Sequence, residues 1–181
     1  MKKPLELSIF RNKLPFRISQ NAISMDNLEW LLKEDFDFNV FLKTKGKDLQ
    51  RPLVWNLFQK QQLIISILKE IQLPPFYIIQ SRNEDKSITY KVIDGKQRLT
   101  TILSFYKNEF PIIYNNIEYF YNDLSEKAKY AIAYCDIRTY YGYEYVDEPI
   151  SDDSLIEWFE RINFSGTPQD IEHLNNIKDT I

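Results

Sequence analysis

The chain has 181 residues with a formal net charge of -3, and its 44% hydrophobic and 27% charged residues predict one globular domain over residues 1–181. A single cysteine and a single histidine exclude a disulfide framework, a cysteine-rich zinc site and a metal or nuclease centre built from several histidines. No apolar run approaches the roughly 18 residues of a membrane span and no signal peptide is visible, which predicts a cytoplasmic protein without a membrane partner.

The first part of the chain predicts two helices before the first strong strand signals. Ser24 is a cap residue for a helix over residues 25–34, and residues 36–42 are apolar enough for a strand or a packed loop. A longer amphipathic helix is predicted over residues 56–72. Its continuation is forbidden by the dipeptide Pro74-Pro75.

Two hairpins follow, one on each side of a central helix. Residues 76–80 and 87–93 predict strands joined by a polar turn, and residues 110–114 and 117–121 predict a second pair. The turn of the second pair is Asn115-Asn116, a dipeptide that tolerates positive φ.

The last part predicts a helix over residues 125–134, a Tyr-rich strand over 137–146, a helix capped by Ser151, and a final helix beginning at Thr167. Short strands and helices without regular βαβ alternation indicate the α+β class. We therefore expect a small mixed sheet with hairpins, surrounded by helices.

The segment Asp94-Gly95-Lys96-Gln97-Arg98 lies where the second strand stops and helical spacing of apolar residues resumes from Leu99. A helix amino terminus offers unpaired backbone N–H groups and a partial positive charge, and Lys96 and Arg98 add two full charges. A nucleotide phosphate suits this junction, with Arg98 as a bidentate ligand of the phosphate. Asp94 would hold a metal ion or orient a base or ribose. The alternative is a tight turn with a surface lysine and a salt-bridged arginine.

Two further polar segments are ambiguous when read alone. Gln50-Arg51-Pro52 precedes Trp55, so Arg51 is a candidate anion ligand, while Trp55 is read as a core residue in preference to a stacking surface. The segment from Asn163 to Thr167 fits an interhelical turn. Cys135 has no histidine partner nearby in sequence and is read as buried and inert.

Charge is unevenly distributed along the chain. Residues 1–110 carry 18 basic and 12 acidic side chains, or +6, whereas residues 111–181 carry 5 and 14, or -9. Either the acidic residues solvate surface helices, or the basic half holds an anion site and the acidic half faces away or meets a partner.

In order and approximate spacing, these segments resemble the N-terminal domain family of GmrSD-type modification-dependent restriction proteins. The hallmarks are QRP-x-x-W at 50–55, IDG[QK]QRLTT at 93–101 and N-x-x-G-T-P at 163–168. The resemblance covers nearly the whole chain and implies a fold similar to ParB and sulfiredoxin, in which a strand-to-helix turn with a basic residue binds a nucleotide. Leu49 and Lys96 depart from the family's usual Tyr and Gln.

The resemblance implies a nucleotide-binding domain in DNA restriction, phage defence or phage counter-defence, acting as a nucleoside triphosphatase or a nucleotide sensor with Mg²⁺. The implied catalytic residues are Asp94, Arg98 and Arg51, with Asp94 also as the metal ligand. The implied ligand-binding residues are Gly95, Lys96, Gln97, Thr100, Thr101, Gln50 and Asn163. A C-terminal nuclease domain is expected to be absent, which suggests a separate nuclease or restriction subunit as partner. The rival hypotheses are a DNA-binding adaptor without turnover and a ParB-like nuclease.

Overall fold

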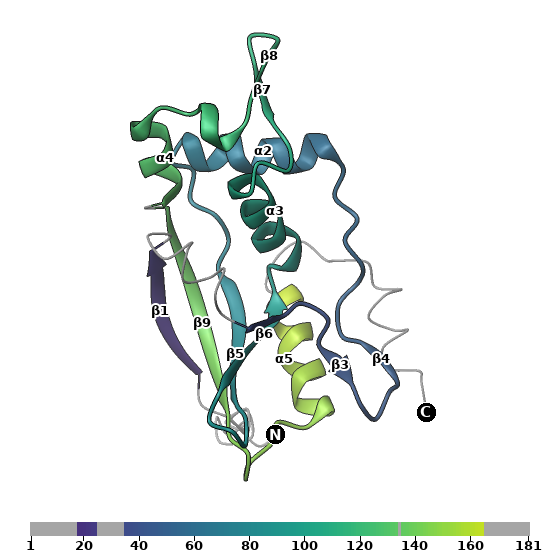
Figure 1. The fold of residues 1–181 in the computed structure, drawn as a ribbon. Helices are drawn as coiled ribbons and strands as arrows, with labels where there is room; N and C mark the ends of the chain where they lie inside the picture. The colour runs from purple at the N-terminus through teal and green to yellow at the C-terminus, as the bar shows by residue number, and fades with distance from the viewer. Residues whose placement is uncertain (1–17, 25–34, 134, 165–181) are drawn as a thin grey trace, which may run out of the picture.

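A five-stranded mixed sheet is the centre of the fold, in the computed structural model that describes residues 18–24, 35–133 and 135–164 (Figure 1). Its strands, in spatial order, are β1 (Ile18–Ser24), β9 (Asp136–Glu144), β5 (Phe76–Arg82), β6 (Ile88–Asp94) and β2 (Asp35–Asp37). The pairs β1–β9 and β5–β6 are antiparallel, whereas β5–β9 and β2–β6 are parallel. This mixed sheet, together with its helices, confirms the α+β class.

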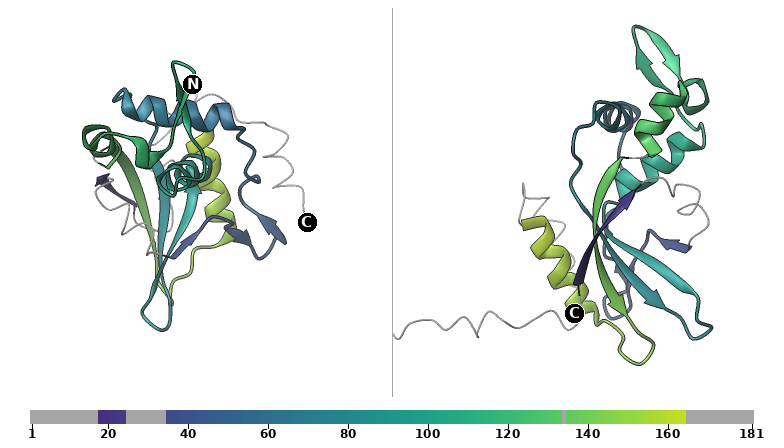
Figure 2. Two further views of the ribbon diagram at one scale, coloured as in Figure 1. Left: turned by 45° about the horizontal axis from the view of Figure 1, so that its top comes forward. Right: turned by 90° about the vertical axis from the view of Figure 1, so that its left-hand side faces the viewer.

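The helices are α2 (Leu57–Leu68), α3 (Lys96–Tyr106), α4 (Glu126–Ala133) and α5 (Asp152–Phe164), with a short 3₁₀ turn η3 (Tyr121–Asp123). Two small hairpins add β3 (Phe41–Leu42) with β4 (Lys47–Asp48), and β7 (Ile112–Tyr114) with β8 (Ile117–Tyr119). Helices α2, α3 and α4 gather at one end of the sheet, while α5 lies along a face (Figure 2). In the part of the chain that the structure describes, no helix is long and apolar enough to cross a membrane.

Alternate residues of the central strands separate two hydrophobic cores. Ile78 of β5 and Val92 of β6 belong to the core beneath α2, α3 and α4. Their neighbours Ile79 and Ile93 belong to the core beneath α5 and the β3–β4 hairpin. All four side chains are at most 1% exposed, as expected for strands covered on both faces. The end of β6, from which α3 starts, is therefore held from two sides.

Several predicted elements are confirmed with small shifts of their ends. The hairpins over 76–93 and 110–121, the helix at 125–134 and the strand at 137–146 correspond to β5–β6, β7–β8, α4 and β9. Asn115 and Asn116 take φ of 50° and 61°, the positive values that a tight hairpin turn requires.

The helix predicted over residues 56–72 begins as expected, because Asn56 caps α2 through a capping box with Gln59, but it ends four residues early at Leu68. Glu70 adopts a φ of 56°, and the N–H of Ile71 donates to the Ser66 carbonyl at 2.9 Å. This is a Schellman ending, made here without the usual glycine. Ile71 consequently leaves the predicted apolar face and is 53% exposed.

Some predictions lie on residues that the structure does not describe, and one is refined. The helices predicted over residues 25–34 and from Thr167 onward lie outside the described residues. Ser24, the expected cap of the helix over residues 25–34, is the last residue of β1. Residues 36–42 divide between β2, which pairs with β6, and β3 of the small hairpin.

Three strands are joined by a buried carboxylate on the α5 side of the sheet. Glu144 of β9 is 8% exposed and accepts hydrogen bonds from Ser81 and Lys91, both at 2.5 Å. Its other oxygen accepts from the Ile150 N–H at 3.0 Å. Burial alone would raise the pKa of Glu144, but the hydrogen bonds from Lys91 and Ser81 outweigh it and leave the pKa below its ordinary value.

Acid should therefore destabilise the fold through Glu144. A carboxyl whose pKa is lower in the folded state stabilises that state above its unfolded pKa, and the contribution is lost as pH falls through the folded value. We expect Glu144→Gln to lower the free energy of unfolding by about 1–3 kcal/mol at pH 7 and to flatten its decline below pH 5. Urea unfolding of both proteins between pH 3 and 7 measures this, and parallel pH profiles would contradict it.

Candidate functional site

The junction between β6 and α3 is built around Gly95, which caps α3 with a φ of 103°. A Cβ at this position would lie 2.6 Å from Cε1 of Phe76 and closer still to Cδ1, so both the backbone conformation and the neighbouring ring require glycine. Among the described residues, no side chain caps the first turn of α3. The backbone N–H groups of that turn therefore lack the side-chain partner that most helices provide.

Arg98 is a structural clamp at this junction. Its guanidinium lies 4.9 Å from the centre of the Phe76 ring and donates to the carbonyls of Pro74 and Pro75 and, at 2.9 Å, to Oδ2 of Asp94. Burial lowers the pKa of Arg98, and the negative charge of Asp94 opposes that effect. These contacts match the salt-bridged alternative considered for the sequence.

Asp94 and Arg98 thus largely compensate each other's charge. A role of Arg98 as a bidentate phosphate ligand, or of Asp94 as a metal ligand, would compete with the contacts that hold the turn. Across the described ranges, no group of three or more His, Cys, Asp or Glu side chains is arranged to hold a metal ion. The roles proposed for both residues in catalysis stay predictions.

Lys96, the first residue of α3, is enclosed instead of lying on the surface. It is only 6% exposed, and its amino group donates to Oδ1 of Asn39 at 2.6 Å. No carboxylate of the described residues forms an ion pair with it within 4.0 Å. Asn39 is oriented by its own N–H, which donates to Oδ1 of Asp37 at 2.9 Å just after β2.

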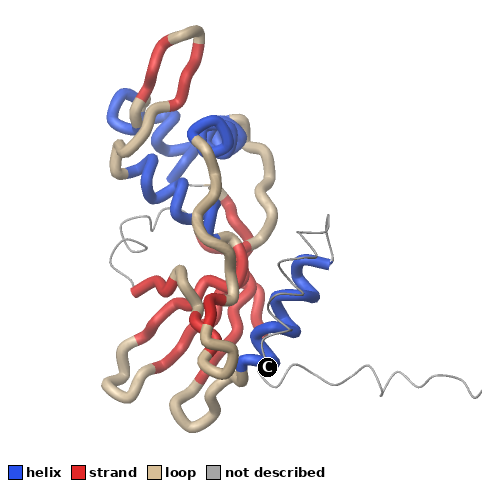
Figure 3. The backbone as a smooth tube through the Cα atoms, turned by 90° about the vertical axis from the view of Figure 1, so that its right-hand side faces the viewer, coloured by secondary structure: helices blue, strands red, loops and turns tan. Residues whose placement is uncertain are grey.

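The loop between β4 and α2 is fastened to the same junction by two glutamines. Gln97 donates to the Pro52 carbonyl at 2.8 Å, and its Oε1 accepts from the N–H groups of Val54 and Trp55 at 3.1 and 3.3 Å. Gln50 is 8% exposed and donates to the Ile93 carbonyl at 2.5 Å. Figure 3 shows the loops that flank α2 descending toward the strand ends. The first two sequence motifs therefore meet in space.

Arg51 lies between these two fastened residues. Its side chain is exposed, and none of the ion pairs formed in residues 35–133 or 135–164 involves it. Because Gln50 and Pro52 are both bonded to the junction, the backbone of Arg51 is held next to it while the guanidinium remains accessible. Trp55, read from the sequence as core, is partly buried against the core beneath α2.

The remaining predicted ligands are less favourably placed. The hydroxyl groups of Thr100 and Thr101 donate to carbonyls one turn back in α3, both at 2.7 Å, and Thr101 is 1% exposed. Asn163 is 8% exposed near the end of α5, where its Nδ2 donates to the Phe159 carbonyl at 2.7 Å. These contacts give each residue a structural role in its own helix, and their ligand-binding roles stay predictions.

Asn39 was not predicted from the sequence, whereas Gln50 was predicted as a ligand and has one polar atom that is unpaired among the described residues. Asn39 escaped notice because its proximity to Lys96 depends on the parallel pairing of β2 with β6, which local patterns do not encode. The pair Asp37 and Asn39, typical of an Asx turn, was the only available signal. The Oε1 atom of Gln50 is buried and finds no hydrogen-bond partner in the described structure, an arrangement more typical of a polar site than of a core.

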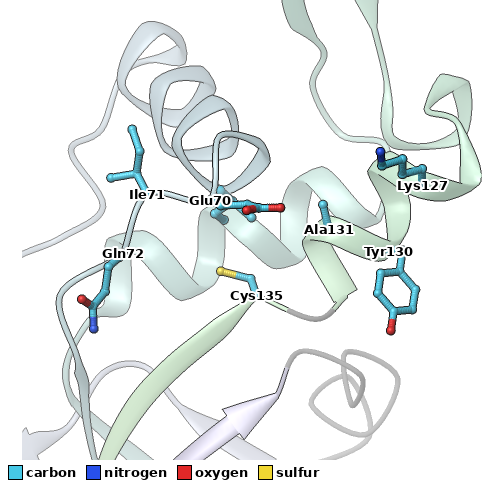
Figure 4. A pocket seen from close by; sticks show the side chains of 8 residues that line it. Glu70, Ile71, Gln72, Lys127, Tyr130, Ala131 and Cys135 are labelled. Atoms are coloured by element: carbon cyan, nitrogen blue, oxygen red, sulfur yellow. The ribbon is translucent and has the colours of Figure 1, made fainter.

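A pocket of about 530 Å³ opens elsewhere, between the end of α2 and α4 (Figure 4). It is lined by Ile67, Glu70, Ile71, Gln72, Lys127, Tyr130, Ala131 and Cys135. None of these is a predicted ligand or catalytic residue. Cys135 is half-buried at this pocket, which corrects the expectation that it is buried.

Comparison with known families gives one match. The sequence model described as GmrSD restriction endonuclease, N-terminal domain, matches residues 41–177. This range contains the QRP-x-x-W, IDG[QK]QRLTT and N-x-x-G-T-P segments. No curated protein and no solved structure matches the chain.

Replacement of Gly95 should be far more costly than replacement of Gly46, the other glycine with positive φ among the described residues. Gly46 has a φ of 67° and open space around its Cβ position, so Gly46→Ala should cost about 1–2 kcal/mol of backbone strain. Gly95→Ala adds the collision with Phe76, worth about 1–3 kcal/mol more. Urea unfolding of the two variants measures the difference, and equal losses would show that Phe76 moves aside freely.

Loss of the Gln97 side chain should release the loop between β4 and α2. Gln97→Ala removes one donor and one shared acceptor, so hydrogen exchange at the N–H groups of Val54 and Trp55 should accelerate by about tenfold or more. Mass spectrometry of exchanged peptides covering residues 50–58 measures the rate. Gln62→Ala, an exposed change on α2, is the matched control.

Proposed function

We propose that this chain, which belongs to the GmrSD restriction endonuclease N-terminal domain family, binds nucleotide phosphates where β6 meets α3 and serves DNA restriction or phage defence. The family match supports the biological setting. The enclosed charge of Lys96 supports the ligand class.

A lysine at the first position of a helix is electrostatically unfavourable, because the partial positive charge of the helix end adds to that of the side chain. Here Lys96 is also 94% removed from solvent, and its hydrogen bond to Asn39 brings no negative charge. Burial of an unpaired charge carries a desolvation cost that an anionic ligand would offset. The uncapped N–H groups beside Gly95 are further donors for the same anion.

Arg51 supports a ligand with several phosphate groups in preference to a single anion. Its backbone is held next to the junction by the bonds of Gln50 and Pro52, and its side chain is exposed. A nucleoside diphosphate or triphosphate offers phosphate oxygens both to Lys96 and to a second cation. In this proposal Lys96 and the α3 amides hold one phosphate, and Arg51 closes over the next.

Whether the bound nucleotide is hydrolysed depends on chemistry that Asp94 alone would supply. One carboxylate oxygen of Asp94 is bonded to Arg98, and the described residues provide no acidic cluster beside it. These residues do not build a metal centre of their own, so Mg²⁺ would arrive with the triphosphate. The proposal is therefore nucleotide binding or sensing, and phosphate release is a separate measurement.

A second candidate, DNA binding without turnover, is favoured by the lysines of the β3–β4 hairpin. Lys43, Lys45 and Lys47 lie within five residues, a few positions before Arg51. Such a cluster suits the DNA backbone, and binding through it would weaken steeply with salt. A restriction system with a separate nuclease domain would use either activity, and the nuclease would be the partner.

Titration calorimetry with ATP, GTP, CTP and UTP, each with Mg²⁺, tests the proposal. We expect at least one nucleotide to bind, and Lys96→Gln and Arg51→Ala each to weaken it by about 10- to 100-fold, the value of a lost charge-assisted hydrogen bond. Lys107→Gln makes the same charge change at the other end of α3 and should alter affinity less than about twofold.

Folded protein that binds none of the four nucleotides would overturn the proposal, as would equal losses in Lys96→Gln and Lys107→Gln. Release of inorganic phosphate, measured in the same samples, distinguishes a triphosphatase from a sensor. If the protein binds duplex DNA at low salt but binds no nucleotide, the second candidate is favoured.

A further inference from the structure

The partner of Lys96 is neutral where a buried lysine usually meets an acid. Asn39 accepts the hydrogen bond at 2.6 Å through Oδ1, the atom that a carboxylate of aspartate would place in the same position. A carboxylate there would form an ion pair inside the protein. The amide instead orients the ammonium group and leaves its charge uncompensated.

The acids of β2 and β6, and Glu144 of β9, all have hydrogen-bond partners other than Lys96. Asp37, two residues before Asn39, accepts the Asn39 N–H at 2.9 Å, and Asp35 accepts the Thr89 hydroxyl at 2.8 Å. Asp94 is paired with Arg98, and Glu144 with Lys91. The local network of acids thus compensates Arg98 and Lys91 but supplies no ion pair to Lys96.

We infer that Asn39 is a positioning residue of the anion site, which holds Lys96 in place by a neutral hydrogen bond and thereby reserves its charge for a phosphate group. This inference rests on the proposed function, because it assigns Asn39 a role in that same site. It also defines the ligand class more sharply, since a neutral or cationic ligand would leave the charge of Lys96 uncompensated.

Asn39 is well placed to do this without depending on the rest of the site. Its backbone N–H is fixed by the turn on Asp37, and the turn follows directly from β2, whose Phe36 stacks on Tyr90 at 5.3 Å. The side chain itself is exposed, so a change of one atom there does not disturb either core. Asn39→Asp therefore adds a negative charge while the shape of the side chain stays nearly the same.

Binding of inorganic tripolyphosphate and of the tightest-binding nucleotide should be compared in wild-type protein, Asn39→Asp and Asn39→Ala. Asn39→Asp should weaken both ligands at least tenfold, because the new carboxylate pairs with Lys96 and neutralises the charge that would bind phosphate. Asn39→Ala leaves the charge of Lys96 uncompensated and removes only the hydrogen bond that orients it, so this variant should weaken both ligands less. Asn122→Asp, the same change in the exposed turn η3, should leave affinity within twofold.

A double-mutant cycle separates positioning from a general effect of charge. In a Lys96→Gln background, Asn39→Asp should cause little further loss, since the group it compensates is gone. The melting temperature of Asn39→Asp should equal or exceed that of the wild type, because an ion pair replaces a neutral hydrogen bond.

The two failures are distinguishable. Wild-type protein that binds neither tripolyphosphate nor any nucleotide overturns the proposed function and this inference with it. Wild-type protein that binds, with Asn39→Asp binding equally well, overturns the role of Asn39 alone. An equal loss from Asn39→Asp with and without Lys96 also overturns it, because the effect would then not pass through Lys96.

Discussion

The contact of Phe76 with Gly95 is the constraint on which the arrangement of this domain depends. The ring occupies the place that a Cβ at residue 95 would need, and Arg98 stacks above the same ring. Through Arg98 the ring is joined to the carbonyls of Pro74 and Pro75, where the chain enters β5, and to Asp94, where β6 ends. One aromatic side chain thus fixes the entry to one strand, the exit from its neighbour and the start of α3.

Lys96 and Arg98, two basic residues in the first turn of α3, have opposite environments. Arg98, at the third position of α3, has an acid, two carbonyls and an aromatic face, so its charge is used inside the fold. Lys96, two residues earlier, has one neutral amide. Because arginine suits multidentate structural contacts and lysine carries a compact charge, this division agrees with the chemistry of the two side chains.

The sequence predicted the strand-to-helix junction, because Val92, Ile93, the Asp94-Gly95 turn and the helical spacing from Leu99 are local signals. That the segment at 50–55 lies beside this junction was expected only from the family resemblance. It did not predict which charges are compensated. The clamp formed by Arg98 requires Pro74 and Pro75, which lie 24 and 23 residues away, and Lys96 requires Asn39, 57 residues away. The early end of α2 also escaped, since Glu70 is an unusual residue for a left-handed ending.

The partner of Lys96 stands at the end of a very small strand. β2 has three residues and, within the described part of the chain, pairs with β6 alone, so opening this edge breaks few hydrogen bonds compared with opening the centre of the sheet. Any opening that carries Asn39 away also releases the Lys96 amino group from the hydrogen bond that orients it. If Lys96 binds phosphate as proposed, order at this edge and occupancy of the site are thermodynamically linked: a bound phosphate would stabilise β2, and loss of β2 would lower the affinity for phosphate.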